Sequence, residues 1–131
     1  MRLYLSSENV GRYADRLVEL VGDKKTLVYI PNARDSWVSQ QEKQLVREKT
    51  AAHKAQFEGL GFTFIPLDLK DYFGERKFSE KDFKDTGLIW APGGNTFMLR
   101  RAMYDSGFDV ILKKLLKDDT LVYGGSSAGA I

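Results

Sequence analysis

The 131-residue sequence contains no cysteine and only one histidine, His53. The missing cysteine excludes disulfides, thiolate metal ligands and a cysteine nucleophile, and it fits a reducing compartment, so we expect a cytoplasmic protein. The single histidine restricts acid–base catalysis, because imidazole is the side chain that most often serves as a general base at neutral pH. His53 falls late in a long charged helical segment, and we expect it to be a solvated surface residue.

The sequence also has no large excess of positive or negative charge and no long apolar run. The 20 Lys and Arg residues and 18 Asp and Glu residues are interspersed and give a net charge of +2, which argues against a nucleic-acid partner. No apolar run approaches the roughly 20 residues of a membrane-spanning helix, and the opening "MRLYLSS" turns polar too early for a signal peptide. We therefore expect no membrane association.

Sequence motifs that bind nucleotides or metal ions are missing as well. Neither G-x-x-x-x-G-K-[ST] nor G-x-G-x-x-G occurs, and the acidic residues show no metal-ligand spacing, so we predict no cofactor and no metal. The composition, 43% hydrophobic and 29% charged, is that of an ordinary globular chain, and residues 1–131 fit one α/β domain.

Short apolar runs alternate with longer segments of helical periodicity. This alternation predicts a doubly wound, mostly parallel sheet with helices on both faces. The expected strands are 3–5, 26–30, 62–67, 88–91 and 121–123. The expected helices run from Ser6, Ser7 or Asn9 to Val21, from Ser36 or Ser39 to Phe57, from Asn95 or Thr96 to Met103, and from Phe108 to Leu116. Segment 71–85 is expected to be irregular, with one short helix after Ser79.

Turns rich in Ser, Asn or Gly follow most of these strands. In an open parallel sheet the carboxyl ends of the strands meet at one rim, where ligands bind. Segments 6–7, 31–33, 92–95 and 124–129 should therefore face one crevice.

The last of these turns carries the pattern G-x-S-x-G, in Gly125-Ser126-Ser127-Ala128-Gly129 directly after an apolar strand. This arrangement is typical of a nucleophile elbow, in which a sharp turn exposes a serine and the following N–H groups face a developing oxyanion. Ser127 is the candidate nucleophile, because Ser126 lacks glycines two residues away on both sides. The alternative is an inert Gly/Ser turn.

The turn Pro92-Gly93-Gly94-Asn95 allows the backbone to approach a ligand and to present free N–H groups. The plainer interpretation is a glycine turn with Asn95 or Thr96 as a helix cap.

Several side chains near the predicted rim have two interpretations. Arg34 and Asp35 could recognise substrate charge, although a surface salt bridge or helix cap is the simpler explanation for each. Trp90 is expected in the core, and Trp37 could either line the crevice or pack.

Two stretches together, "PGGNTFMLRRA" and "LVYGGSSAGAI", with "YIPNA" before them, resemble the peptidase E group of serine peptidases, family S51. That group includes aspartyl dipeptidases and, more distantly, cyanophycinases. The resemblance implies a class I glutamine amidotransferase-like, flavodoxin-like fold and a small peptide substrate. It also implies Ser127 as the nucleophile, the N–H groups of Gly94 and Ala128 as the oxyanion hole, and Asn95 in substrate binding.

The resemblance also implies a Ser-His-acid arrangement in which the histidine and the acid follow the nucleophile in the sequence. Only residues 128–131 follow Ser127 here, so we expect a C-terminally incomplete, N-terminal part of such a domain. The alternative to a serine hydrolase is an inactive truncated homologue or binding module that keeps the fold. Residues 121–123 are expected to expose apolar surface and an unpaired strand edge, which a homodimer would cover.

Overall fold

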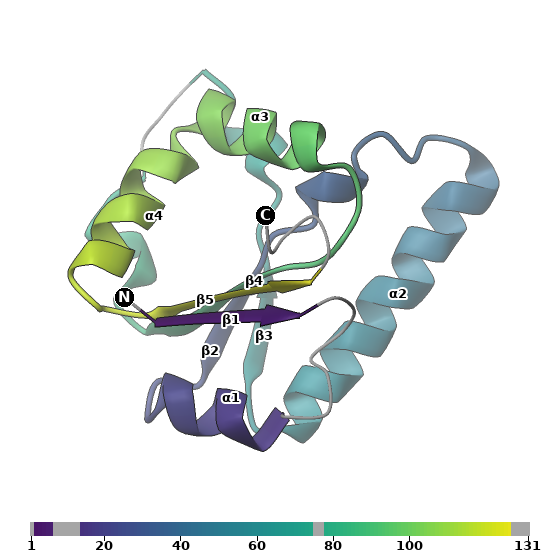
Figure 1. Ribbon diagram of the computed structural model, residues 1–131. Coiled ribbons are helices and arrows are strands. Elements are labelled where there is room, and N and C mark those ends of the chain that lie inside the picture. The colour runs from purple at the N-terminus through teal and green to yellow at the C-terminus, as the bar shows by residue number, and fades with distance from the viewer. Residues whose placement is uncertain (1, 7–13, 75–77, 127–131) are drawn as a thin grey trace.

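The computed structural model describes residues 2–6, 14–74 and 78–126, and these form a five-stranded sheet in which every pairing is parallel. The strands lie in the order β1-β5-β4-β2-β3 (Figure 1). Their bounds are β1 Arg2–Ser6, β2 Thr26–Tyr29, β3 Thr63–Pro66, β4 Thr86–Ala91 and β5 Val122–Ser126.

Within the described residues, four α-helices cover the two faces of this sheet. They are α1 Ala14–Val21, α2 Gln40–Gly59, α3 Thr96–Ser106 and α4 Phe108–Lys117, with short 3₁₀ helices η1 Asn32–Arg34, η2 Leu69–Tyr72 and η3 Glu80–Phe83. Helices α1 and α2 lie on one face, and α3 and α4 on the other (Figure 1). The predicted doubly wound α/β fold is confirmed.

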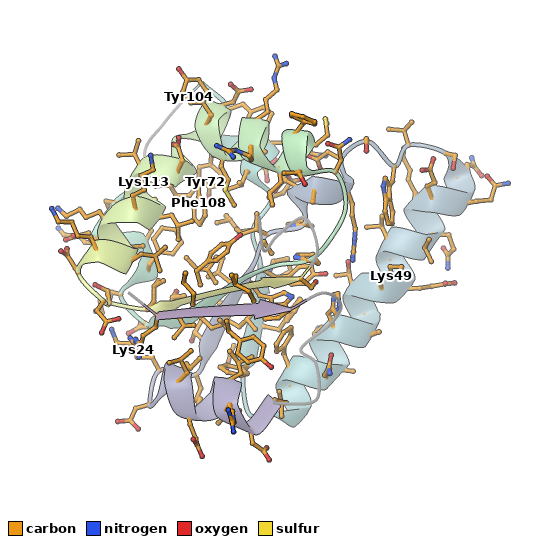
Figure 2. All side chains as sticks on the ribbon, viewed as in Figure 1. Lys24, Lys49, Tyr72, Tyr104, Phe108 and Lys113 are labelled. Atoms are coloured by element: carbon orange, nitrogen blue, oxygen red, sulfur yellow. The ribbon has the colours of Figure 1, made fainter. Side chains whose placement is uncertain are left out.

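A separate hydrophobic core fills each side of the sheet, because successive side chains of a strand point to opposite faces. Leu88 and Trp90 of β4 pack toward α1 and α2, whereas Ile89 and Ala91 pack toward α3 and α4. Phe108, fully buried, lies between α4 and the sheet (Figure 2). Trp90 is fully buried too, as predicted for a core residue.

The ends of the helices follow from local sequence signals. Ser39 begins α2 through a capping box, in which Glu42 N donates to Ser39 Oγ at 3.0 Å and Ser39 N donates to Glu42 Oε1 at 3.3 Å. Gly107 separates α3 from α4 in a left-handed conformation with φ of 77°, where glycine is favoured. The short helix predicted after Ser79 is η3.

The expectation of an exposed edge at β5 is wrong. Strand β5 lies between β1 and β4, and Leu121 and Val122 are fully buried. Strand order depends on pairing between distant segments, and the pairing of β1 with β5 was not visible in local periodicity. The edges belong to β1 and β3, so the β5 edge on which the predicted homodimer rested does not exist. Exposed apolar side chains are found instead on β1, at Leu3 and Leu5.

Among the described residues, no helix has the length and apolar character needed to cross a bilayer.

Candidate active site

The chain leaves β2 and β4 toward opposite faces of the sheet. From β2 it passes through α2 to β3, and from β4 it passes through α3 and α4 on the other face to β5 (Figure 1). Ligands of open α/β sheets bind beyond the carboxyl ends of strands at such a switch point. η1, which follows β2, and the loop 92–95, which follows β4, lie at this position.

The loop after β4 is packed closely against η1. Asn95 N donates to Ala33 O at 2.6 Å, and Gly94 adopts a φ of 157°. A Cβ atom built on Gly94 would overlap the carbonyl oxygen of Ala33. Position 94 therefore needs glycine both for its backbone conformation and for the space beside η1.

Asn95 caps helix α3. Its Oδ1 accepts a hydrogen bond from Met98 N at 3.1 Å, which confirms one of the two predicted caps. Asn95 is exposed at the rim, and its role in substrate binding stays a prediction.

Arg34 lies beneath the same loop and is buried, with 8% of its surface exposed. Its Nε donates to Gly93 O at 2.9 Å, and its Nη1 donates to Tyr29 Oη at 3.5 Å. The Trp37 ring centroid lies 5.5 Å from Arg34 Cζ, so Trp37 packs beside the guanidinium. The surface salt bridge expected for Arg34 is wrong: among the described residues the guanidinium forms no ion pair.

His53 is not the surface residue that we expected. It is 4% exposed, and its Nδ1 lies 2.6 Å from Tyr29 Oη. His53 and Phe57 are four residues apart and so share the face of α2 that packs on the sheet. The spacing to Phe57 was the signal that could have revealed this burial.

Burial, reinforced by the positive charges of Arg34 and Lys49, lowers the pKa of His53 to about 4. The imidazole is therefore neutral at pH 7. Arg34 Nη1 donates to Tyr29 Oη, so in the tautomer that carries its proton on Nε2, His53 Nδ1 can accept the phenol proton.

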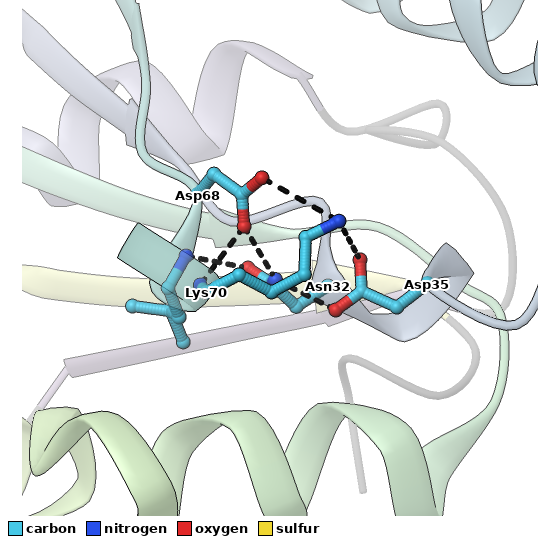
Figure 3. A network of polar contacts seen from close by, with 5 residues as sticks. Asn32, Asp35, Asp68 and Lys70 are labelled. Carbon is cyan, nitrogen blue, oxygen red and sulfur yellow. Dashed lines mark hydrogen bonds and ion pairs between the residues drawn. The ribbon is translucent and has the colours of Figure 1, made fainter. Parts of the chain in front are cut away.

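A second polar cluster, centred on fully buried Asn32, joins η1 to η2 (Figure 3). Asn32 Nδ2 donates to Asp35 Oδ2 at 2.8 Å and to Asp68 Oδ1 at 2.9 Å, and its Oδ1 accepts from Leu69 N at 3.0 Å. Lys70 Nζ lies 3.7 Å from a carboxylate oxygen of each aspartate. Sequence reasoning treated Asn32 only as a turn residue and missed this central role.

Asp35 takes part in that cluster as a partner of Asn32 and Lys70, which agrees with the predicted salt bridge. Burial raises the pKa of its carboxyl group, while the bond from Asn32 opposes that rise. Within residues 2–6, 14–74 and 78–126, no group of three His, Cys, Asp or Glu side chains could hold a metal ion.

A cavity of about 480 Å³ opens elsewhere on the molecule. Its wall includes Thr26 and Thr86, at the amino ends of β2 and β4, and the aromatic rings of Tyr72 and Phe78. Its lining reaches Leu67 beyond the carboxyl end of β3 but includes no residue of η1 or of the loop 92–95, so the cavity is separate from the candidate site.

The predicted nucleophile Ser127 and oxyanion donor Ala128 lie outside the described residues. The strand before them is described: Gly125 pairs with Ala91 of β4, and Ser126 pairs with Ser6 of β1. Ser126 is 4% exposed and is not accessible to a substrate.

The fold and rim geometry define a doubly wound α/β protein with a switch point between β2 and β4, the position at which ligands bind in this class of fold. The chain belongs to peptidase family S51, whose family model matches residues 4–131.

Two of the solved structures that are similar to this chain come from bacteria. A candidate peptidase E protein from Listeria monocytogenes EGD-e is 25% identical, with a TM-score of 0.67. The match covers 98% of this chain and 59% of that one. A peptidase from an acI-B1 Actinobacterium is 20% identical with a TM-score of 0.56, over 98% of this chain and 54% of that one, and it supports the fold alone. The present chain thus spans little more than half the length of either structure.

Proposed function

We propose that this chain supplies the nucleophile and the oxyanion hole of a serine peptidase that acts on small peptides. Ser127 would attack the peptide carbonyl, and the N–H groups of Gly94 and Ala128 would stabilise the resulting tetrahedral anion. Asn95, exposed beside Gly94, would contact the substrate. Membership in family S51 supports this reaction class.

The observation that carries the proposal is the state of the Gly94 N–H. The groups on either side of it are bonded to η1: Gly93 O accepts from Arg34, and Asn95 N donates to Ala33 O. The Gly94 N–H itself donates to no acceptor among the described residues. A backbone donor that is fixed in place yet unused is what stabilisation of a developing oxyanion requires.

The register of the sheet supports the pairing of this donor with the serine loop. Strands β4 and β5 are hydrogen-bonded neighbours, and Ala91 at the end of β4 pairs with Gly125. The chain therefore leaves the two strands at the same level of the rim, through the Gly93-Gly94 loop and through the segment containing Ser127. Burial of Ser126 removes the competing serine.

The general base of this proposal lies outside the 131 residues. The sequence has one histidine, and His53 is buried with its Nδ1 bonded to Tyr29 and its pKa lowered to about 4. A group of that pKa is a weak base at neutral pH.

A fluorophosphonate probe tests the proposal, because it forms a covalent bond with an activated serine. The full-length protein should be labelled at Ser127, as located by peptide mass spectrometry. Ser127→Ala should abolish labelling, and Ser126→Ala, the matched control, should retain it. Absence of labelling in the wild type beside a reactive control hydrolase would count against the proposal, as would labelling that persists in Ser127→Ala.

The second candidate is a binding module that keeps the crevice without catalysis, and the unsuitable environment of His53 favours it. In that case small peptides bind with equal affinity to the wild type and to Ser127→Ala, and neither protein hydrolyses them. Calorimetric titration together with product analysis separates the two candidates.

A further inference from the structure

The geometry points to Arg34 as a positioning residue that sets the orientation of the Gly93–Gly94 peptide and thereby the direction of the Gly94 N–H. This inference rests on the proposed function for its catalytic consequence. Its structural half concerns only described residues.

The planar peptide bond couples the carbonyl group of Gly93 to the N–H group of Gly94. In a trans peptide the C=O and the N–H point in opposite directions, and every described peptide is trans. Arg34 Nε holds Gly93 O at 2.9 Å. The N–H of Gly94 is in the same peptide plane, so it must point away from Arg34.

A peptide between two glycines needs such a restraint. Glycine reaches both signs of φ easily, so rotation of the Gly93–Gly94 unit meets little steric resistance of its own. A flipped unit would present a carbonyl oxygen where the proposed site needs a donor, and the oxyanion would be repelled. The bond from Arg34 opposes that flip, and the bond from Asn95 N to Ala33 O fixes the next peptide.

The burial of Arg34 argues for a specific role. A buried guanidinium without a carboxylate partner is costly, and among the described residues Arg34 forms no ion pair. Its hydrogen-bond acceptors are instead the Gly93 carbonyl and the Tyr29 phenol, and Trp37 packs beside it. A charge-assisted bond to Gly93 O also polarises the peptide, which makes the Gly94 N–H a stronger donor.

The Tyr29 contact orients the guanidinium. Tyr29 Oη lies 2.6 Å from His53 Nδ1 and accepts from Arg34 Nη1. The Nη1 side of the guanidinium is therefore held by Tyr29 of β2, which in turn contacts His53 of α2. Nε is left directed at the loop. Lysine has a single ammonium group and cannot occupy both positions.

The test uses Arg34→Met and Arg34→Lys, with Arg101→Met as the control. Arg101 is exposed on α3 and pairs with Asp105, so its replacement removes the same charge without touching the loop. Circular dichroism and denaturant unfolding identify variants that fold. Arg34→Lys retains the buried charge and keeps the test usable if Arg34→Met does not fold.

The first readout does not depend on activity. The ¹⁵N relaxation dispersion of the Gly94 amide should be flat in the wild type and in Arg101→Met. It should show microsecond-to-millisecond exchange in Arg34→Met, with a smaller effect in Arg34→Lys. An unchanged Gly94 amide in a folded Arg34→Met protein would overturn the inference.

The second readout is the rate of fluorophosphonate labelling. In Arg34→Met the limiting rate at saturating probe should fall roughly 10- to 100-fold, the order expected when an oxyanion donor is misplaced, with the half-saturating probe concentration unchanged. Exchange at Gly94 with no loss of rate would overturn the catalytic role. If the wild type is not labelled, the proposed function fails, and the amide measurement still decides whether Arg34 holds the peptide.

Discussion

Acidification should weaken the fold through His53, and the structure gives the size of the effect. The folded state holds the pKa of His53 at about 4, against an ordinary value of 6.5. Between these values the unfolded chain binds a proton that the folded chain does not. The unfolding free energy contributed by His53 is therefore fully present above pH 6.5 and is lost as the pH falls toward 4.

The unfolding free energy changes by about 1.4 kcal/mol for each pH unit between the two pKa values. The total loss is therefore roughly 3 kcal/mol. That is a large part of the roughly 5–15 kcal/mol that stabilises a typical domain. The physical cause is that a charged imidazole would be buried away from water and repelled by the positive charges of Arg34 and Lys49.

The assay is urea unfolding at pH 7.5, 6.5, 5.5 and 4.5, followed by the fluorescence of buried Trp90. His53→Asn is the comparison, because its amide oxygen can still accept from Tyr29 but does not titrate. Other groups, Asp35 included, titrate alike in both proteins. The unfolding free energy of the wild type, relative to that of His53→Asn, should therefore fall by about 2.5 kcal/mol between pH 7.5 and 4.5. Parallel pH profiles for the two proteins would refute the reasoning.

Two further substitutions test the packing and the polar cluster. Gly124→Ala places a Cβ 2.6 Å from Trp90 Cε3, so overpacking should lower the unfolding free energy by about 1–3 kcal/mol, measured by urea unfolding. Asn32→Ala removes the side chain that bonds two carboxylates and a backbone N–H, and it should cost about 2–3 kcal/mol in the same assay. Values within 0.5 kcal/mol of the wild type would contradict either account.

The elements of the fold were predictable because each carries a local signal. The apolar run of β4 reads as a strand buried on both faces, and all six residues from Thr86 to Ala91 are buried. Ser39 with Glu42 three residues later predicts a helix start, and Gly107 predicts the break between α3 and α4.

The arrangement of those elements was less accessible, since it depends on contacts between distant segments. Nothing near β5 in the sequence indicates that β1 pairs with it and covers its edge. His53 looked solvated because its neighbours along α2 are mostly charged, yet the phenol of Tyr29, 24 residues away, makes its burial favourable. Arg34 is a similar case: its acceptor, Gly93 O, is 59 residues along the chain.

The candidate site and the core of α2 are parts of one hydrogen-bonded chain. It runs from His53 through Tyr29 and Arg34 to Gly93 O, from the helix on one face of the sheet to the rim loop of β4. Each buried polar group in it bonds to the next, and the loss of one such bond typically costs about 0.5–1.5 kcal/mol. The loop that carries the Gly94 N–H is therefore connected to α2 through two buried side chains, Arg34 and Tyr29.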